Sequence, residues 1–160
     1  MSEFFRMDSY DLFDEQLKKA AEEFRKIDKK EVIRLISHLD ADGISACSIM
    51  IKLLNNDNRK YSVSIVQQLN RAVLSQLAVE PYNCFIFTDI GSGVINEIKE
   101  LLNGKKVFIL DHHSIENIND FGSIVFINPH TCGIDGGKEI SGAGVVFKFA
   151  CAVDKNMEEL

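Results

Sequence analysis

Apolar positions near the start of the chain follow helical spacing. Between Asp8 and Ile27 they recur about every three or four residues among charged ones, and this period predicts an amphipathic helix. We therefore expect residues 1–30 to form an N-terminal amphipathic helix at the edge of a domain. The apolar positions that support this prediction are Leu12, Leu17, Ala20, Ala21, Phe24 and Ile27.

From Glu31 onward, short apolar runs alternate with helical stretches. Runs such as Phe85–Phe87 and Val107–Leu110 show no polar alternation, as expected of parallel strands covered on both faces. The pattern predicts an α/β fold: a doubly wound, mainly parallel five-stranded sheet with helices on both faces. The expected strands are Val32–Ser37, Tyr61–Val66, Cys84–Thr88, Lys106–Leu110 and Ile124–Ile127, and the expected helices are Gly43–Leu54, Asn70–Leu77, Val94–Leu102 and Gly142–Val153.

Length and composition fit one domain. The chain has 160 residues, of which 46% are hydrophobic and 26% are charged, enough for a core of its own. It contains no apolar run long enough to cross a membrane and no secretory signal pattern, so we expect a cytoplasmic protein. The cysteines form no C-x-x-C pair, which favours free thiols over a zinc site or disulfides. They are Cys47, Cys84, Cys132 and Cys151.

The net charge of -6 has the wrong sign for a chain that binds nucleic acid through its overall charge. Two explanations remain open. The acidic residues form a metal site whose charge is cancelled by the bound ions, or the basic strand-binding surface lies on another domain or a partner.

Polar side chains follow four of the expected strands, where ligands bind in doubly wound sheets. The first strand runs into the segment HLDADG at positions 38–43, the third into Asp89, the fourth into DHH at 111–113 and the fifth into NPH at 128–130. In an extended strand end, residues two apart share a face, so His38, Asp40 and Asp42 are expected to point together.

Imidazoles mixed with carboxylates suit manganese, iron or zinc, and the number of carboxylates indicates a pair of ions. Two such ions could support phosphoryl displacement. Asp42 or Asp89 alone could instead cap a helix, and His130 is as compatible with a surface loop as with a substrate contact. The DHH triplet after an apolar run is harder to explain structurally.

A glycine-rich segment precedes the last expected helix. Residues 133–144 read GIDGGKEISGAG, and Ser141 is a plausible N-cap. Exposed amides at the helix start, from Gly142 to Gly144, could bind a substrate anion. Tight packing of small residues against the sheet explains the pattern equally well, and no Walker loop is present.

Taken in order and spacing, these motifs resemble the DHH phosphoesterases, and most closely the archaeal RecJ-type proteins, some of which associate with the replisome. The resemblance covers about Glu31 to Asp154. It implies a manganese-dependent phosphodiesterase with two Mn²⁺ ions, for which Mg²⁺ or Co²⁺ could substitute. The expected reaction is single-strand-specific 5′-to-3′ exonuclease cleavage of DNA or RNA by two-metal activation of a bridging water.

The resemblance also implies roles for individual residues. His38 and Asp40 would hold one metal ion, Asp42 and His112 would hold the other, and Asp89 would bridge both. His113 would contact the scissile phosphate or protonate the leaving oxygen, and Asp111 would orient the histidines. The expected substrate contacts are His130, Ser141, Gly142 and Gly144.

The chain departs from the family pattern in two ways. The first His of some relatives lies further upstream of the first Asp than His38 does. The family also has a fourth motif, an Asp on a strand after the last helix, for which only Asp135 and Asp154 are nearby candidates. We therefore expect residues 31–160 to be a DHH domain cut before that motif, with the substrate-binding C-terminal domain supplied in cis or in trans.

Two other functions remain open from the sequence. One is hydrolysis of small substrates such as oligonucleotides, cyclic dinucleotides or pyrophosphate. The other is a non-catalytic replisome scaffold, which would have no need for four metal-ligand side chains that repel one another.

Overall fold

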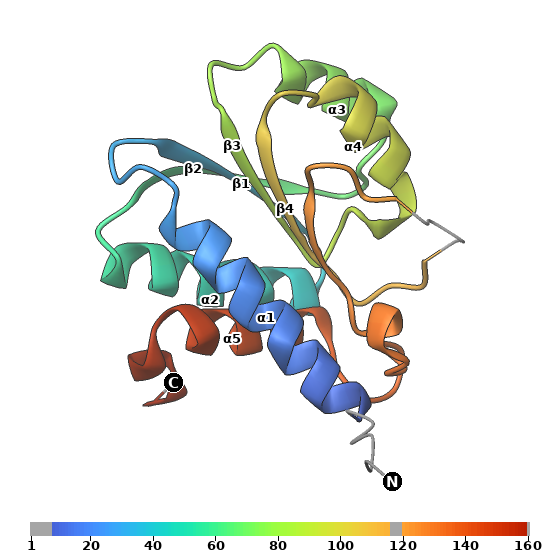
Figure 1. The fold of residues 1–160 in the computed structure, drawn as a ribbon. Helices are drawn as coiled ribbons and strands as arrows, with labels where there is room; N and C mark the ends of the chain where they lie inside the picture. The colour runs from blue at the N-terminus through green and yellow to red at the C-terminus, as the bar shows by residue number, and fades with distance from the viewer. Residues whose placement is uncertain (1–7, 116–119, 160) are drawn as a thin grey trace, which may run out of the picture.

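The computed structural model describes residues 8–115 and 120–159. Within these residues, five strands form one sheet in the order β2-β1-β3-β4-β5, and all neighbouring pairs are parallel. The doubly wound fold predicted from the sequence is confirmed (Figure 1). The strands are β1 Val32–His38, β2 Lys60–Val66, β3 Cys84–Thr88, β4 Lys106–Leu110 and β5 Val125–Ile127.

Helices cover both faces of the sheet (Figure 1). A hydrophobic core lies between each face of the sheet and the helices that cover it. Successive strand residues point to opposite faces, so Leu35 and Phe108 belong to the first core, and Ile36 and Ile109 belong to the second. The first layer contains α1 Ser9–Arg25, α2 Ala41–Asn56 and α5 Gly142–Val153, and the second contains α3 Arg71–Ala78 and α4 Ile95–Leu101. Short 3₁₀ turns at Ser92–Val94, Pro129–Cys132 and Lys155–Glu159 were not expected from the pattern.

Helix α1 belongs to the first core. Asp8 caps it by accepting a hydrogen bond from the Asp11 amide, and Phe13 and Phe24 are fully buried. Leu12, one of the apolar positions that predicted the helix, is 43% exposed. A helix turns by about 100° per residue, so the buried stripe through Phe13, Leu17 and Phe24 leaves Leu12 facing solvent.

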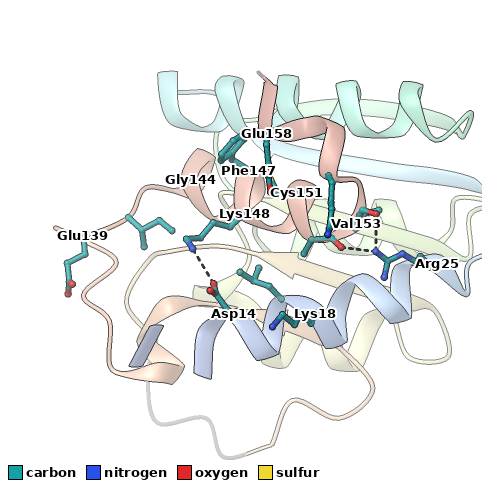
Figure 2. Close-up of a pocket in the computed structure, with 14 residues that line it drawn as sticks. Asp14, Lys18, Arg25, Glu139, Gly144, Phe147, Lys148, Cys151, Val153 and Glu158 are labelled. Atoms are coloured by element: carbon teal, nitrogen blue, oxygen red, sulfur yellow. Dashed lines mark hydrogen bonds and ion pairs between the residues drawn. The ribbon is translucent and has the colours of Figure 1, made fainter. Parts of the chain in front are cut away.

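The outer surfaces of α1 and α5 are linked at two places, one of which is the ion pair between Asp14 and Lys148 at 3.2 Å. The Arg25 guanidinium donates hydrogen bonds to the carbonyls of Ala152 and Val153. Beside this link lies a cavity of about 790 Å³, lined by both helices (Figure 2). Gly144 lines this cavity.

The four cysteines are free thiols, as predicted. In the described part of the chain, no helix has the length and apolar character needed to span a bilayer.

Candidate metal centre

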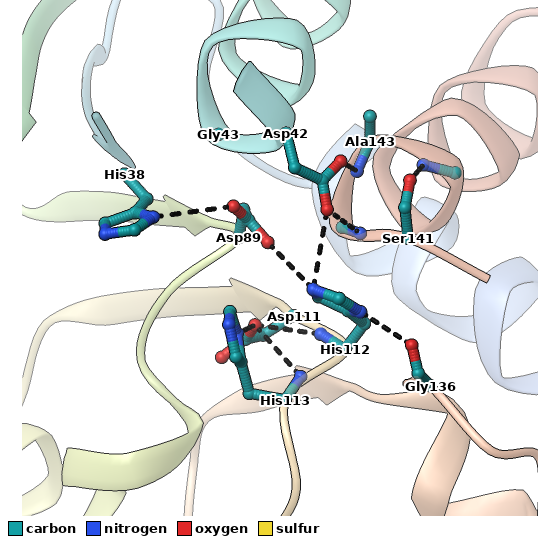
Figure 3. A network of polar contacts seen from close by, with 12 residues as sticks. His38, Asp42, Gly43, Asp89, Asp111, His112, His113, Gly136, Ser141 and Ala143 are labelled. Atoms are coloured by element: carbon teal, nitrogen blue, oxygen red, sulfur yellow. Dashed lines mark hydrogen bonds and ion pairs between the residues drawn. The ribbon is translucent and has the colours of Figure 1, made fainter. Parts of the chain in front are cut away.

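The predicted site residues gather at the carboxyl ends of the strands, on both sides of the boundary between β1 and β3 (Figure 3). The chain leaves β1 toward β2 on one side, and β3 lies on the other. Such a switch point leaves a crevice in which doubly wound folds bind their ligands. Asp89 lies at its centre, between His38 and His112.

The segment after β1 turns into a helix sooner than expected. Asp40 is the N-cap of α2 and accepts a hydrogen bond from the Gly43 amide at 2.9 Å, which lowers the pKa of Asp40. The expectation of an extended strand end is therefore wrong, because α2 begins at Ala41. His38 Nδ1 still lies 3.0 Å from Asp40 Oδ2, whereas Asp42 sits in the first helical turn and faces α5.

Asp42 is held by the start of α5. The amides of Gly142 and Ala143 each donate to its carboxylate at 2.8 Å. A carboxylate at a helix N-terminus satisfies free amides and complements the helix dipole. Asp42 Oδ2 also lies 3.4 Å from His112 Nε2, so the side chain connects α5 to the centre.

Asp89 carries the clearest sign that the site is incomplete without a cation. Its side chain is 1% exposed, and neither carboxylate oxygen has a hydrogen-bond partner among the described residues. Its φ of 57° is left-handed, a conformation that costs free energy for a non-glycine residue. Burial, with Asp42 and Asp111 nearby, raises the pKa of Asp89 to about 7. The alternative role of helix cap fails, since Asp89 caps nothing.

Two histidine rings have one nitrogen fixed by a backbone carbonyl. His112 Nδ1 lies 2.7 Å from the Gly136 carbonyl, and His38 Nε2 lies 3.2 Å from that of Gln67. A carbonyl only accepts, so these nitrogens carry the protons. In the neutral rings, His112 Nε2 then presents a lone pair to Asp89 Oδ1 at 3.3 Å. A nitrogen lone pair and a carboxylate that face each other suit a cation between them. Metal-bound histidines usually donate the N–H of their other ring nitrogen to a carbonyl or carboxylate, as these two rings do.

His113 is oriented differently. Its Nδ1 lies 2.7 Å from Asp111 Oδ1, and this hydrogen bond raises the pKa of His113 to about 9. Burial opposes ionisation of Asp111, but the His113 ring and the Ser92 amide hold the pKa of Asp111 at about 2. Asp111 thus orients the His113 ring, whereas for His112 it accepts only the backbone amide at 2.8 Å.

The donor set fits a pair of divalent ions. Two groups of ligand atoms, each within 4.8 Å, occur among the described residues and share Asp89. One group contains His38 and Asp40, and the other contains His112 and His113. The second differs from the predicted pair of Asp42 with His112, although Asp42 lies in contact distance. Two groups that share a carboxylate lie close enough together to hold a pair of neighbouring ions, as two-metal sites do.

The predicted substrate contacts lie around the centre but are engaged. Ser141 caps α5 and binds the Gly144 amide at 3.2 Å, and the Gly142 amide binds Asp42. His130 donates its backbone amide to Asn128 at 3.0 Å, and its ring lies beside Gly136. Their contact with substrate stays a prediction.

Neither candidate for the fourth carboxylate joins the two ligand groups. Asp135 pairs with Lys138 and accepts the Gly137 amide. Asp154 accepts hydrogen bonds from Asn156.

Several supporting roles were not assigned from the sequence. Asn128 is fully buried, and its Nδ2 donates to Ser92 Oγ at 3.0 Å and to the His113 carbonyl at 2.9 Å. It therefore ties together the loops that follow β3, β4 and β5. Its place after the fifth apolar run was the available signal. The carbonyls of Gln67 and Gly136 gave none, because any residue has a carbonyl.

Comparisons with known proteins identify related sequences and a related fold. The profile of the DHH family, N-terminal domain, matches residues 32–160. An uncharacterised protein of Methanocaldococcus jannaschii is 37% identical over 123 residues, which are 74% of this chain and 28% of that protein. The single-stranded-DNA-specific exonuclease RecJ of Bacillus subtilis is 28% identical over 156 residues, 91% of this chain and 20% of RecJ.

A solved structure shares the fold. RecJ of Thermus thermophilus in complex with Mn²⁺ matches with a TM-score of 0.72 and 24% identity, over 89% of this chain and 21% of that one. The chain thus spans less than a third of each of these three proteins.

Proposed function

Since the chain belongs to the DHH family, with a RecJ-like N-terminal domain, we propose that it is the metal-binding part of a phosphodiester hydrolase. The observation that carries the proposal is Asp89. A buried carboxylate without partners, shared by two ligand groups, costs stability unless a cation binds it. A scaffold that had lost catalysis would have no use for a carboxylate that lowers the stability of its fold.

In this proposal, His38, Asp40 and Asp89 would hold one divalent ion, and Asp42 and His112, together with Asp89, would hold the other. The bound ions, proposed to be Mn²⁺, would lower the pKa of a water and stabilise charge on the phosphoryl group. The Mn²⁺ bound to the Thermus relative supports the choice of metal.

His113 has a separate task. Asp111 holds its Nδ1, so its Nε2 is free to contact a phosphate oxygen or to pass a proton to the leaving oxygen. The side chain of His113 is 54% exposed, against 18% for His112, which leaves it accessible to substrate.

We propose single-stranded DNA as the substrate, because the Bacillus relative is named as specific for it. RNA, 5′-to-3′ polarity and association with replisome proteins are further proposals from the family resemblance. The net charge of -6 opposes binding of a polyanion. The strand-binding surface is therefore proposed to lie outside these 160 residues.

The test combines metal binding with cleavage. Calorimetric titration should show Mn²⁺ binding that Asp89→Ala abolishes and Asp135→Ala preserves, since Asp135 lies outside both ligand groups. A labelled single strand should be cleaved weakly by this chain and strongly once the remaining part of the protein is added. Manganese binding that survives Asp89→Ala would overturn the proposed centre.

A further inference from the structure

Strand β2 forms one edge of the sheet (Figure 1). Its residues 60–66, which we call the open edge, pair with β1 and make no other backbone–backbone hydrogen bond within the described part of the chain. An exposed strand edge is a template for a further strand unless shortness, charge or proline protects it. At the other edge, β5 has three residues. Strand β2 has seven and, after Lys60, contains neither a charged residue nor a proline.

Apolar side chains lie on the open edge and beside it, on the face of the sheet that α2 covers. Tyr61 packs against the first core, and its hydroxyl donates to Asn55 of α2 at 3.1 Å. Val63 and Ile65 follow at intervals of two residues and therefore point to the same face; they are 36% and 42% exposed. Ile44, about three helical turns before Asn55 on the same side of α2, is 45% exposed. The edge thus presents both free backbone groups and apolar surface to solvent.

The region around the open edge lacks the negative charge of the rest of the chain. The chain has 24 Asp and Glu residues and a net charge of -6, but residues 43–79 contain a single carboxylate, that of Asp57, which is paired with two cations. The exposed cations on α2 and β2 are Lys52 and Lys60, which are too few to hold a nucleic acid strand. Two copies of an acidic chain repel each other elsewhere, and here they can approach without that repulsion.

The open edge, KYSVSIV, is complementary to itself when a second copy runs antiparallel to it. With a two-fold axis at Val63, this valine lies opposite its own copy, and Tyr61 lies opposite Ile65. Aromatic and β-branched residues are favourable partners across antiparallel strands, and like charges are unfavourable ones. In this register no charged residue lies opposite another. The remaining pairs are Ser62 with Ser64 and Lys60 with Val66.

We propose that two copies of the chain associate through the open edge, so that their sheets join into one continuous sheet. Opposite residues of paired strands share a face, so both α2 helices lie on the same face of the joined sheet and Ile44 and Ile65 of each copy are covered. The two β2 strands run in opposite directions. The candidate metal centres, at the carboxyl ends of the strands, therefore lie at opposite margins of the joined sheet, where both stay open. This association does not depend on the proposed hydrolase.

Residue 63 provides the test, because the two-fold register places it opposite itself. Sedimentation velocity over about 1–300 µM should show the native chain passing from monomer to dimer, with slower amide exchange at 60–66 in the dimer. Val63→Lys and Val63→Glu each place like charges opposite one another and should each weaken the dimer at least about tenfold. A mixture of the two variants should form heterodimers, because the repulsion becomes an attraction. The matched control is Leu12→Lys, which also charges an exposed leucine or valine position but lies on α1, beside β5.

The outcomes decide between a second copy and other occupants of the edge. A native chain that stays monomeric throughout the range, dimers that persist in Val63→Lys, dimers lost in Leu12→Lys, or mixed variants that stay monomeric would each overturn the proposal. Circular dichroism establishes that the variants fold, and the concentration series on the native chain needs no variant. If amides 60–66 become protected only when the proposed strand-binding region is added, that region occupies the edge in place of a second copy, and the proposal falls.

Discussion

Replacing Asp89 by asparagine should stabilise the metal-free protein, although the change removes a proposed metal ligand. The carboxylate is 1% exposed and has no hydrogen-bond partner among the described residues. Burial raises its pKa from 3.8 to about 7, so the fold disfavours the ionised form. Asparagine keeps the shape, carries no charge, and can donate to His112 Nε2, which lies 3.3 Å from Asp89 Oδ1.

The expected gain in unfolding free energy follows from the pKa shift of Asp89. A shift of about 3 units at about 1.4 kcal/mol each gives an upper bound of about 4 kcal/mol at a pH above 7. A realistic gain is about 1–4 kcal/mol, worth several degrees in melting temperature for a chain of this size.

The sign of the pH dependence is fixed by the raised pKa. Below about pH 4, the carboxyl is protonated in both the folded and the unfolded state, and Asp89→Asn should equal the native chain. As the pH rises through about 7, the native chain loses this stability and the variant does not. The difference in stability between the variant and the native chain should therefore develop between about pH 4 and about pH 7.

The assay is thermal and urea unfolding in a chelator, at about pH 4 and about pH 8. Asp42→Asn serves as the matched control. Asp42 accepts one amide of α5 on each carboxylate oxygen. Asparagine has only one acceptor oxygen, so this variant should lose about 1 kcal/mol instead. A fall in stability for Asp89→Asn at the higher pH, or no difference between the two pH values, would refute the reasoning.

Three further predictions concern the supporting structure and the reaction. Gly142→Ala should destabilise the chain by more than about 2 kcal/mol in chemical unfolding and weaken manganese binding, because its Cβ would lie 2.1 Å from Asp89 Oδ1; native stability would show that α5 can shift. Asn128→Ala should cost about 2–3 kcal/mol by the same measurement, because it leaves Ser92 and the His113 carbonyl without their partner; a loss within error would contradict its role as a link. With the proposed strand-binding region present, His112→Ala should reduce manganese-dependent release of labelled nucleotides at least about a hundredfold, and unchanged release would remove His112 from the proposed centre.

The elements predicted best from sequence are those whose borders coincide with a change of pattern. Strands β3 and β4 and helix α5 begin and end where predicted, because each apolar run is bounded by polar or glycine residues. Helix α2 begins two residues early, since Asp40 acts as its N-cap. From the sequence, Asp40 was interpreted only as a metal ligand. A pattern of residue types indicated this one role of the side chain and gave no sign of its second role as a helix cap.

The convergence of Asp89 and His112 was predictable for a related reason. Parallel strands end at one edge of the sheet, so polar residues that follow separate strands must meet there. The orientation of each ring was not predictable. It depends on carbonyls such as that of Gly136, which lies 24 residues further along the chain than His112.

The start of α5 shows where pattern and structure differ most. Free amides among small residues predicted a bound anion, and the structure places an anion there, the carboxylate of Asp42 from 100 residues away. The small residues are explained by the same contact, because a side chain at Gly142 would collide with Asp89. Anion binding and tight packing were alternatives in the sequence, but they are two aspects of one interface. Helix α5 therefore supports the candidate metal centre, and the Arg25 side chain of α1 bonds to the far end of α5.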